Sequence, residues 1–202
     1  MTDVKFNKLL IFLNALIPLA LLAYDGFRGQ LGANPVEFFI RTTGVLTLTF
    51  LLITLAVTPL RKLLNWNEAI KYRRMLGLFA FFYGCLHLSS YFIFDRGLSL
   101  KSTVADVVER PFITVGMAAY LMMVPLAVTS TKGMVKRLGG KRWQRLHRLI
   151  YLIAPLGAIH FYMLVKSDVF YPAIFGLVAA VLLIYRIYAR QQKKIVKPAV
   201  AR

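Results

Sequence analysis

The sequence has 202 residues, 58% of them hydrophobic, with a mean hydropathy of +0.63 and a formal net charge of +18. A soluble domain of this length is closer to about 45–50% apolar, so the composition excludes an ordinary soluble globular protein. The single cysteine, Cys85, excludes a disulfide framework and a Cys-x-x-Cys site.

Six long intervals of the chain contain no charged residue. They are 16 to 21 residues long and cover 9–24, 42–60, 75–94, 111–131, 149–165 and 169–185. About 20 helical residues span a hydrocarbon core of about 30 Å. We therefore predict an all-α integral membrane protein whose bundle has six transmembrane helices, at about 9–24, 42–60, 75–94, 111–131, 147–165 and 169–188.

These helices form one predicted domain over residues 1–202, without an internal repeat, and residues 189–202 form a basic tail. We expect the first helix to stay uncleaved, because no small-residue cleavage site precedes Asp25. Residues 96–111, which end at a proline, are predicted to form a short surface helix.

The basic residues are distributed unevenly between the two sides of the predicted bundle. Twenty of the 26 lie in 1–8, 59–74, 131–148 and 186–202, and only 6 lie in the alternate loops 25–41, 95–111 and 166–168. Because basic loops stay inside, both termini are predicted to be cytoplasmic. Such loops also attract anionic lipid headgroups, so the high net charge does not indicate a nucleic-acid partner.

Two of the three histidines are predicted to lie at the same membrane depth. His87 lies about 18 Å and His160 about 20 Å from the inner face, each on its own helix. An ionisable residue inside the bilayer indicates a functional site, although each imidazole could simply hydrogen-bond a neighbouring helix. Gly84 and Gly157 each precede one histidine by three residues and leave space beside it. The pattern therefore favours a porphyrin whose iron is bound by His87 and His160.

The third histidine, His147, is predicted near the inner face, about 20 Å along the helix from His160. On the facing helix the same level carries Arg73 and Arg74, which are poor iron ligands but good partners for propionates or phosphates. The inner face thus holds either a second, five-coordinate haem, a different cofactor, or no site.

The chain lacks a Gly-x-Gly-x-x-Gly dinucleotide motif and a Walker loop. It therefore receives electrons from another molecule, either a lipid-soluble quinol or a separate cytoplasmic flavin reductase. With a haem in the outer half of the membrane, we expect the electron acceptor to lie outside.

Four segments resemble the MsrQ family: "TPLRKLL", "YRRMLGLFAFFYGCLHLSSY", "ERPFITVGMAAYLMMVPLAVTS" and "LGGKRWQRLHRLIYLIAPLGAIHFY". MsrQ proteins are haem-binding membrane subunits of bacterial MsrPQ methionine sulfoxide reductase systems. They belong to a ferric-reductase-like transmembrane group that includes the NADPH oxidases. The resemblance implies haem b at His87 and His160, with His147 at a possible second site. The wider group has a histidine at the inner position of the third helix, where this sequence has arginine.

The resemblance also implies an FMN, for whose phosphate Arg73, Arg74 and the 132–145 loop are candidate partners. It implies the bacterial inner membrane as location, and electrons from the quinone pool or a flavin reductase. The acceptor would be MsrP, a periplasmic molybdenum enzyme that reduces oxidised methionines in proteins. The chain would then be an electron-transfer subunit of the system and would not be its catalytic subunit.

Two other functions remain open on the sequence alone. One is a six-helix proton or solute carrier with a histidine relay, although the inverted repeats and broken helices typical of carriers are not evident. The other is a stand-alone ferric reductase that acts directly on an external metal.

Overall fold

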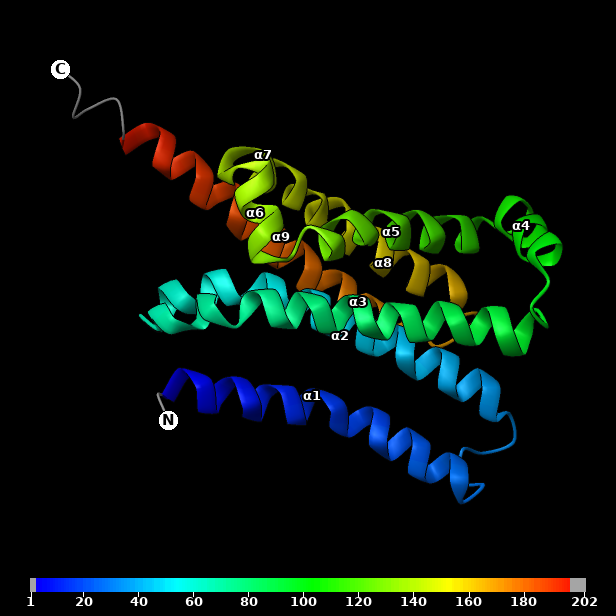
Figure 1. Ribbon diagram of the computed structural model, residues 1–202. Coiled ribbons are helices and arrows are strands. Elements are labelled where there is room, and N and C mark those ends of the chain that lie inside the picture. Colours follow the sequence, from blue (N-terminus) through cyan, green and yellow to red (C-terminus); the bar gives the residue numbers. More distant parts are fainter. Residues whose placement is uncertain (1–2, 197–202) are drawn as a thin grey trace.

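The computed structural model describes residues 3–196, except for the side chains of 190 and 193–196, and all regular structure in that range is helical (Figure 1). The long helices are α1 (Asp3–Phe27), α2 (Pro35–Leu63), α3 (Arg73–Ser90), α5 (Pro111–Val128), α8 (Ile150–Leu164) and α9 (Phe170–Val196). The short elements are η1 (Asn67–Lys71), η2 (Tyr91–Asp95), α4 (Leu100–Glu109), α6 (Lys132–Leu138), α7 (Gly140–Leu146) and η3 (His147–Leu149).

Five of the six predicted spans coincide with helices that are long and apolar enough to cross a membrane. Helices α1, α2 and α9 extend past the uncharged intervals because charged residues continue each helix, whereas α5 ends inside its interval, at Val128. At the start of α2, for example, the side chain of Asn34 caps the helix and Pro35 occupies its first turn. The segment predicted at 147–165 is a 3-10 turn followed by the 15-residue α8, so its crossing stays a prediction.

The predicted surface helix before Pro111 is confirmed as α4. The predicted basic tail, in contrast, begins inside α9, which continues to Val196. Residues 197–202 of that tail lie outside the described residues.

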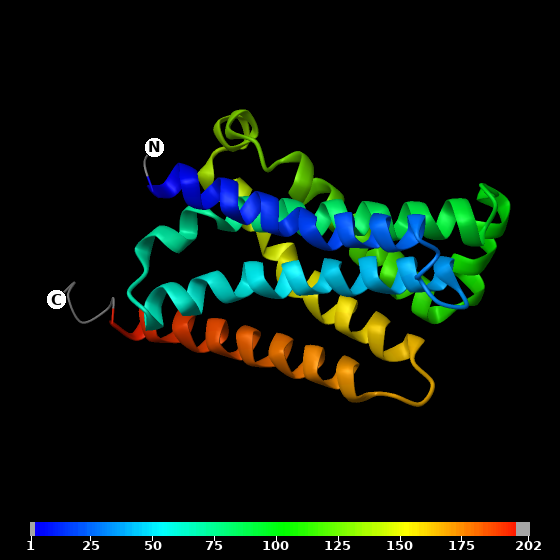
Figure 2. The same cartoon turned by 90° about the horizontal axis from the view of Figure 1, so that it is seen from below.

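The long helices lie roughly side by side and alternate in direction (Figure 1). We call one end of the bundle the basic end: α2, α5 and α9 finish there, and α6 and α7 lie beside it. At the opposite end, α4 connects η2 to α5. Contacts join α2 to α3, α5 to α8, and α9 to both α2 and α8. Figure 2 shows α9 alongside α2.

The core lies between α2, α3 and α8. Leu55, Ala80, Tyr83 and Ile153 have no measurable exposure there, and the ring of Tyr83 stacks on Phe50 with centroids 5.5 Å apart. Small and branched side chains at these positions let the three helices pack closely. The core therefore fixes the relative position of α3 and α8, which carry the histidines.

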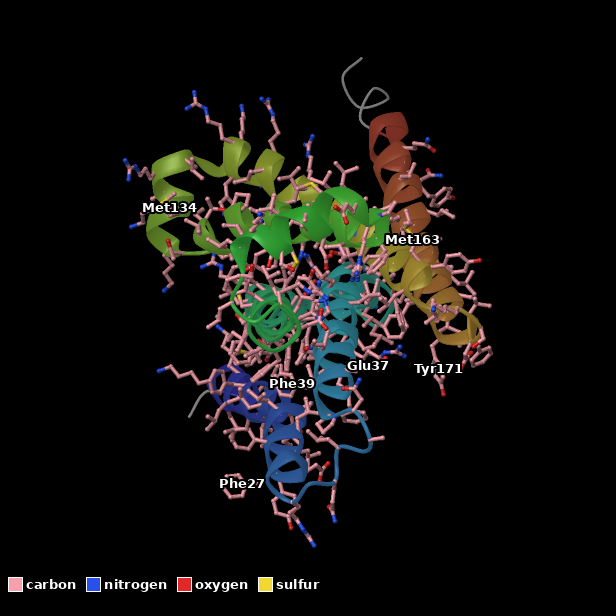
Figure 3. The ribbon with its side chains drawn as sticks, turned by 90° about the vertical axis from the view of Figure 1, so that its right-hand side faces the viewer. Phe27, Glu37, Phe39, Met134, Met163 and Tyr171 are labelled. Carbon is pink, nitrogen blue, oxygen red and sulfur yellow. The ribbon has the colours of Figure 1, made fainter. Side chains whose placement is uncertain are left out.

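Helix α1 lies at the edge of this bundle (Figures 1 and 2). The hydroxyl of Tyr83 donates to the carbonyl of Ala15 at 2.6 Å, and the amide of Asn7 donates to the Tyr72 hydroxyl at 3.2 Å. Phe27 at the end of α1 is almost fully exposed and points away from the other helices (Figure 3). An apolar cleft of about 350 Å³ separates α1 from α3; it is lined by Phe12, Leu16, Met75, Leu78, Phe79 and Phe82.

The helix pairs α2–α3 and α5–α8 have related sequences, which our sequence analysis missed. The motif Leu-Ala-Val-Thr occurs at 55–58 on α2 and at 126–129 at the end of α5. Gly-Cys-Leu-His at 84–87 on α3 matches Gly-Ala-Ile-His at 157–160 on α8. Both pairs run in the same sense along the bundle (Figure 1). The two helix pairs therefore share these short motifs and the same direction along the bundle.

Candidate functional site

The structure brings His87 and His160 together, as their predicted depths required. The two imidazole rings face each other across the bundle with centroids 6.1 Å apart and planes nearly perpendicular, at 80°. His87 lies on α3 and His160 on α8. Each of the helix pairs α2–α3 and α5–α8 therefore contributes one imidazole.

Each imidazole is held by a backbone carbonyl on the neighbouring helix. Nδ1 of His87 lies 2.9 Å from the carbonyl oxygen of Ile40, and Nδ1 of His160 lies 2.7 Å from that of Phe112. A carbonyl can only accept, so Nδ1 carries the proton in both rings. This tautomer leaves the Nε2 lone pair of each neutral imidazole available to a metal.

Two glycines permit this close approach. A Cβ added to Gly44 would lie 3.0 Å from Nδ1 and Cε1 of His87, and one added to Gly116 would lie 2.7 Å from Nδ1 of His160. Real Cβ atoms essentially never lie as close as 2.7 Å to another heavy atom, so a side chain at residue 116 would displace the imidazole of His160.

The sequence reasoning missed both glycines and both carbonyls. Each glycine follows its accepting carbonyl by four residues, in "IRTTG" at 40–44 and in "FITVG" at 112–116. Residues four apart lie on one face of a helix. The repeated Thr-x-Gly in these two segments is the signal that would have identified them.

The predicted glycines Gly84 and Gly157 lie near the pair but face other neighbours. A Cβ on Gly84 would meet Thr47 and Tyr120 at 3.6 Å, which is an ordinary contact distance. A Cβ on Gly157 would meet the Leu48 side chain at 3.3 Å. Both glycines therefore contribute to helix packing at this level, and only Gly44 and Gly116 are in contact range of the imidazoles.

The histidine pair fits an iron bound from both sides. Two metal–imidazole bonds of about 2 Å each, plus the radius of each ring, add to a centroid separation of about 6 Å, close to the distance found. Two neutral imidazole ligands are typical of a haem that transfers electrons and does not bind oxygen. Among the described residues, no three His, Cys, Asp or Glu side chains form a cluster that would hold a bare metal ion.

His147 lies apart from this pair, at the basic end. Its ring stacks on Trp143 with centroids 3.9 Å apart, and its Nε2 lies 3.1 Å from the Thr129 hydroxyl. The indole of Trp143 in turn donates to the Thr129 carbonyl at 2.9 Å. Arg73 and Arg74 are the charged groups that act on His147 electrostatically. The structure thus brings His147, Arg73 and Arg74 into one neighbourhood.

The opposite end carries a cluster of polar groups next to α3. Immediately after the helix of His87 the backbone widens into the π-turn η2, and the Tyr91 hydroxyl donates to Asp106 at 2.6 Å. Asp106 is buried and also pairs with Arg96 and Arg110. The hydrogen bond from Arg96 to Asp95 raises the pKa of that guanidinium. These bonds fix α4 over the end of the bundle.

Comparison with known proteins matches this arrangement to a family. Residues 43–158 match the model of the ferric reductase like transmembrane component. That range begins next to Gly44 and includes Gly116 and His87, and it ends two residues before His160. The match therefore covers both helix pairs almost completely.

Curated relatives cover nearly the whole chain. A protein from Herminiimonas arsenicoxydans is 53% identical over 93% of this chain and 87% of its own length. A protein from Rhodospirillum rubrum is 49% identical over 91% of this chain and 88% of its own. A protein from Bordetella pertussis is 48% identical over 90% of this chain and 89% of its own length. Each is named protein-methionine-sulfoxide reductase heme-binding subunit MsrQ.

Proposed function

The chain belongs to the MsrQ family of ferric-reductase-like transmembrane proteins, and we propose that it is a haem-bearing subunit that transfers electrons across a membrane. The observation that carries this proposal is the facing pair His87 and His160, 6.1 Å apart with each Nδ1 bonded to a carbonyl. Several helices of membrane-spanning length make it a multi-pass membrane protein.

In this proposal, Nε2 of His87 and Nε2 of His160 hold a haem b from its two sides. The haem supplies one-electron redox chemistry when bound. The Ile40 and Phe112 carbonyls keep the proton on Nδ1 of each ring, which orients the ring and makes it a stronger ligand. With both imidazoles bound to it, the iron would have no open position, so the site would favour electron transfer over oxygen binding.

Gly44 and Gly116 have a second effect on the site. Because neither carries a side chain, α2 and α5 can approach the two rings closely, and the Ile40 and Phe112 carbonyls lie within hydrogen-bond distance of Nδ1.

We further propose the route of the electrons and the topology. The 147–165 segment crosses as a sixth helix, and both termini and the basic end face the cytoplasm of a bacterial inner membrane. Electrons come from the quinone pool or a cytoplasmic flavin reductase, with FMN near the basic end. They leave through the histidine pair toward a periplasmic MsrP-type molybdenum reductase that repairs oxidised methionines. The MsrQ relatives carry the name of such a reductase system.

A reduced-minus-oxidised visible spectrum of the purified protein, with a pyridine haemochrome count, tests the proposal. We expect a b-type spectrum that disappears in His87→Ala and in His160→Ala. Full haem content in either variant, or a folded protein without haem, would contradict the assignment. The count in the unchanged protein also decides whether His147 serves a second haem.

A stand-alone ferric reductase is the second candidate, favoured by the description of the matched family model. Rates of reoxidation of the reduced protein separate the two functions. We expect a purified MsrP-type reductase with its sulfoxide substrate to reoxidise it much faster than a ferric chelate does.

A further inference from the structure

Arg186 is a buried cation on the helix α9. Its relative exposure is 8%, and it lies within the stretch Phe170–Ala189 that is apolar enough to cross a membrane. Basic side chains near the ends of membrane helices normally reach out to the headgroups. Arg186 instead points its guanidinium into the protein, among α2, α8 and α9.

Part of this guanidinium has a structural role that follows from Pro59. Because proline lacks an amide hydrogen, Pro59 leaves the carbonyl of Leu55 without its helical partner. Nη2 of Arg186 donates to that carbonyl at 2.8 Å and lies 3.2 Å from the Thr58 hydroxyl. Nη1 donates to the Tyr151 hydroxyl at 3.0 Å. These bonds attach α9 to the end of α2.

The bonds leave the Nε donor without a partner, and although the guanidinium lies over the Tyr151 ring at 5.4 Å from its centroid, Arg186 has no acidic counter-ion among the described residues. Nε is the single buried side-chain nitrogen or oxygen without a hydrogen-bond partner among the described residues. All eight acidic residues of the chain lie in the described range. None of the ion pairs found there includes Arg186; they join Glu37, Glu68, Asp95 and Asp106 to other cations. A buried charge without a counter-ion is costly.

A second cation makes the local charge larger. Arg73 at the start of α3 is close enough to Arg186 and to Tyr151 to interact with both electrostatically. Arg73 and Arg74 also act on His147. Neither arginine has an acidic partner among the ion pairs of the described residues. Arg186 thus donates to Tyr151 and Arg73 lies within electrostatic range of it, while no acidic side chain of the described residues forms an ion pair with either arginine.

We propose that Arg186 and Arg73 form a binding site for an oxyanion at the basic end, beside Tyr151. A phosphate suits it best, because guanidinium groups bind phosphate oxygens through several charge-assisted hydrogen bonds. The phosphate belongs either to a flavin mononucleotide or to an anionic lipid headgroup. Occupation of this site does not require haem at His87 and His160.

The test has to separate ligand binding from the attachment of α9. Pro59→Ala restores an amide hydrogen that can pair with the Leu55 carbonyl, so Arg186 is no longer needed there. We would compare Pro59→Ala with Pro59→Ala/Arg186→Gln and Pro59→Ala/Arg73→Gln in the full-length, detergent-solubilised protein. Pro59→Ala/Arg61→Gln is the matched control, because Arg61 in the last turn of α2 is exposed at the same end. Haem content and thermal unfolding report on folding in every sample.

Titration with FMN and with riboflavin, followed by flavin fluorescence, measures the contribution of the phosphate. Mass spectrometry of co-purified phosphatidylglycerol measures the lipid. We expect loss of either arginine to weaken FMN binding by roughly tenfold or more, with riboflavin binding weak throughout, or to remove the lipid. The Arg61 control should change neither quantity.

Three results would overturn the proposal. One is equal retention of FMN and lipid in the Pro59→Ala background with and without Arg186. Another is equal affinity for FMN and riboflavin in Pro59→Ala together with no bound lipid. The third is an equal loss in the Arg61 control, which would indicate unspecific attraction to the basic end. Absence of haem from all samples would instead contradict the proposed function and leave the anion result standing.

Discussion

Around His87 and His160 the two helix pairs of the bundle supply the same groups, whereas at the basic end they supply different ones. At the histidine pair, each half gives an imidazole, an accepting carbonyl and a glycine. At the basic end, the threonine of the repeated Leu-Ala-Val-Thr motif contacts Arg186 in one half and His147 in the other. Thr58 on α2 thus contacts a charged guanidinium, and Thr129 at the end of α5 contacts an imidazole.

The two regions differ because an iron bound from two sides needs two equivalent ligands. Two helix pairs that each supply one imidazole meet this requirement. The basic end has no such constraint, because Arg74 occupies the position that corresponds to His147 when His87 is matched with His160. We infer that the histidine pair is the common centre and that the basic end carries the specialised interactions.

The largest expected effect comes from breaking the pair itself. His87→Ala or His160→Ala should abolish the haem spectrum, because one imidazole is a poor substitute for two axial ligands. His147→Ala should leave the signal of the pair largely intact. A pyridine haemochrome count measures all three. Equal losses in the three variants would mean that the two ends are not separate sites.

A smaller effect is expected from the glycines that admit the rings. Gly116→Ala should lower haem content and shift the midpoint potential, since a Cβ there would lie 2.7 Å from His160 and overpacking costs about 1–3 kcal/mol. Gly44→Ala should have a weaker effect, at 3.0 Å from His87. The matched control is Gly84→Ala, whose new Cβ finds ordinary contacts. If Gly84→Ala matched Gly116→Ala in redox titrations, the approach of the helices to the rings would not be the cause.

Tyr91→Phe tests the polar cluster around α4, at the end of the bundle opposite the basic end. It removes the hydroxyl that donates to the buried Asp106, and an underpaired buried acceptor costs about 1–3 kcal/mol. We expect faster hydrogen exchange in α4 with an unchanged haem spectrum. Tyr171→Phe is the control because Tyr171 is exposed at the start of α9 (Figure 3). Unchanged exchange in α4 would show that the bond does not hold this helix.

The smallest effect is expected from Thr129→Val. The variant removes the hydroxyl next to Nε2 of His147, which costs about 0.5–1.5 kcal/mol of stability. Thermal unfolding should shift slightly, and the spectrum and potential of the pair should stay the same. A changed potential would mean that His147 and the pair are coupled, and the contrast between the two ends would have to be abandoned.

The sequence predicted the long helices well, because charged residues interrupt apolar runs at membrane spacing. It placed His87 and His160 at one level from helix rise alone. It did not predict that α8 would be short, since a 3-10 turn at His147–Leu149 replaces the first turn of that segment. No apolar pattern distinguishes a 3-10 turn from an α-helical one.

The partners of the histidines could not be found from charge or hydropathy. Backbone carbonyls at Ile40 and Phe112 leave no trace in composition, and Gly44 and Gly116 resemble the packing glycines found throughout membrane helices. By sequence alone, Arg186 was one of the basic residues of 186–202 that set the predicted topology. Only the structure shows that it is buried, because burial depends on which helix lies beside it.

The bond between Arg186 and the Leu55 carbonyl also affects how the protein is made. Leu55 is inserted early, in the second helix, but its carbonyl receives its donor only from the Arg186 side chain, 131 positions later. A polar group left unpaired in lipid is expensive. The closing helix thus completes a bond that the second helix cannot make alone. A chain truncated before α9 would lack this bond and would leave the kink at Pro59 with an unpaired carbonyl.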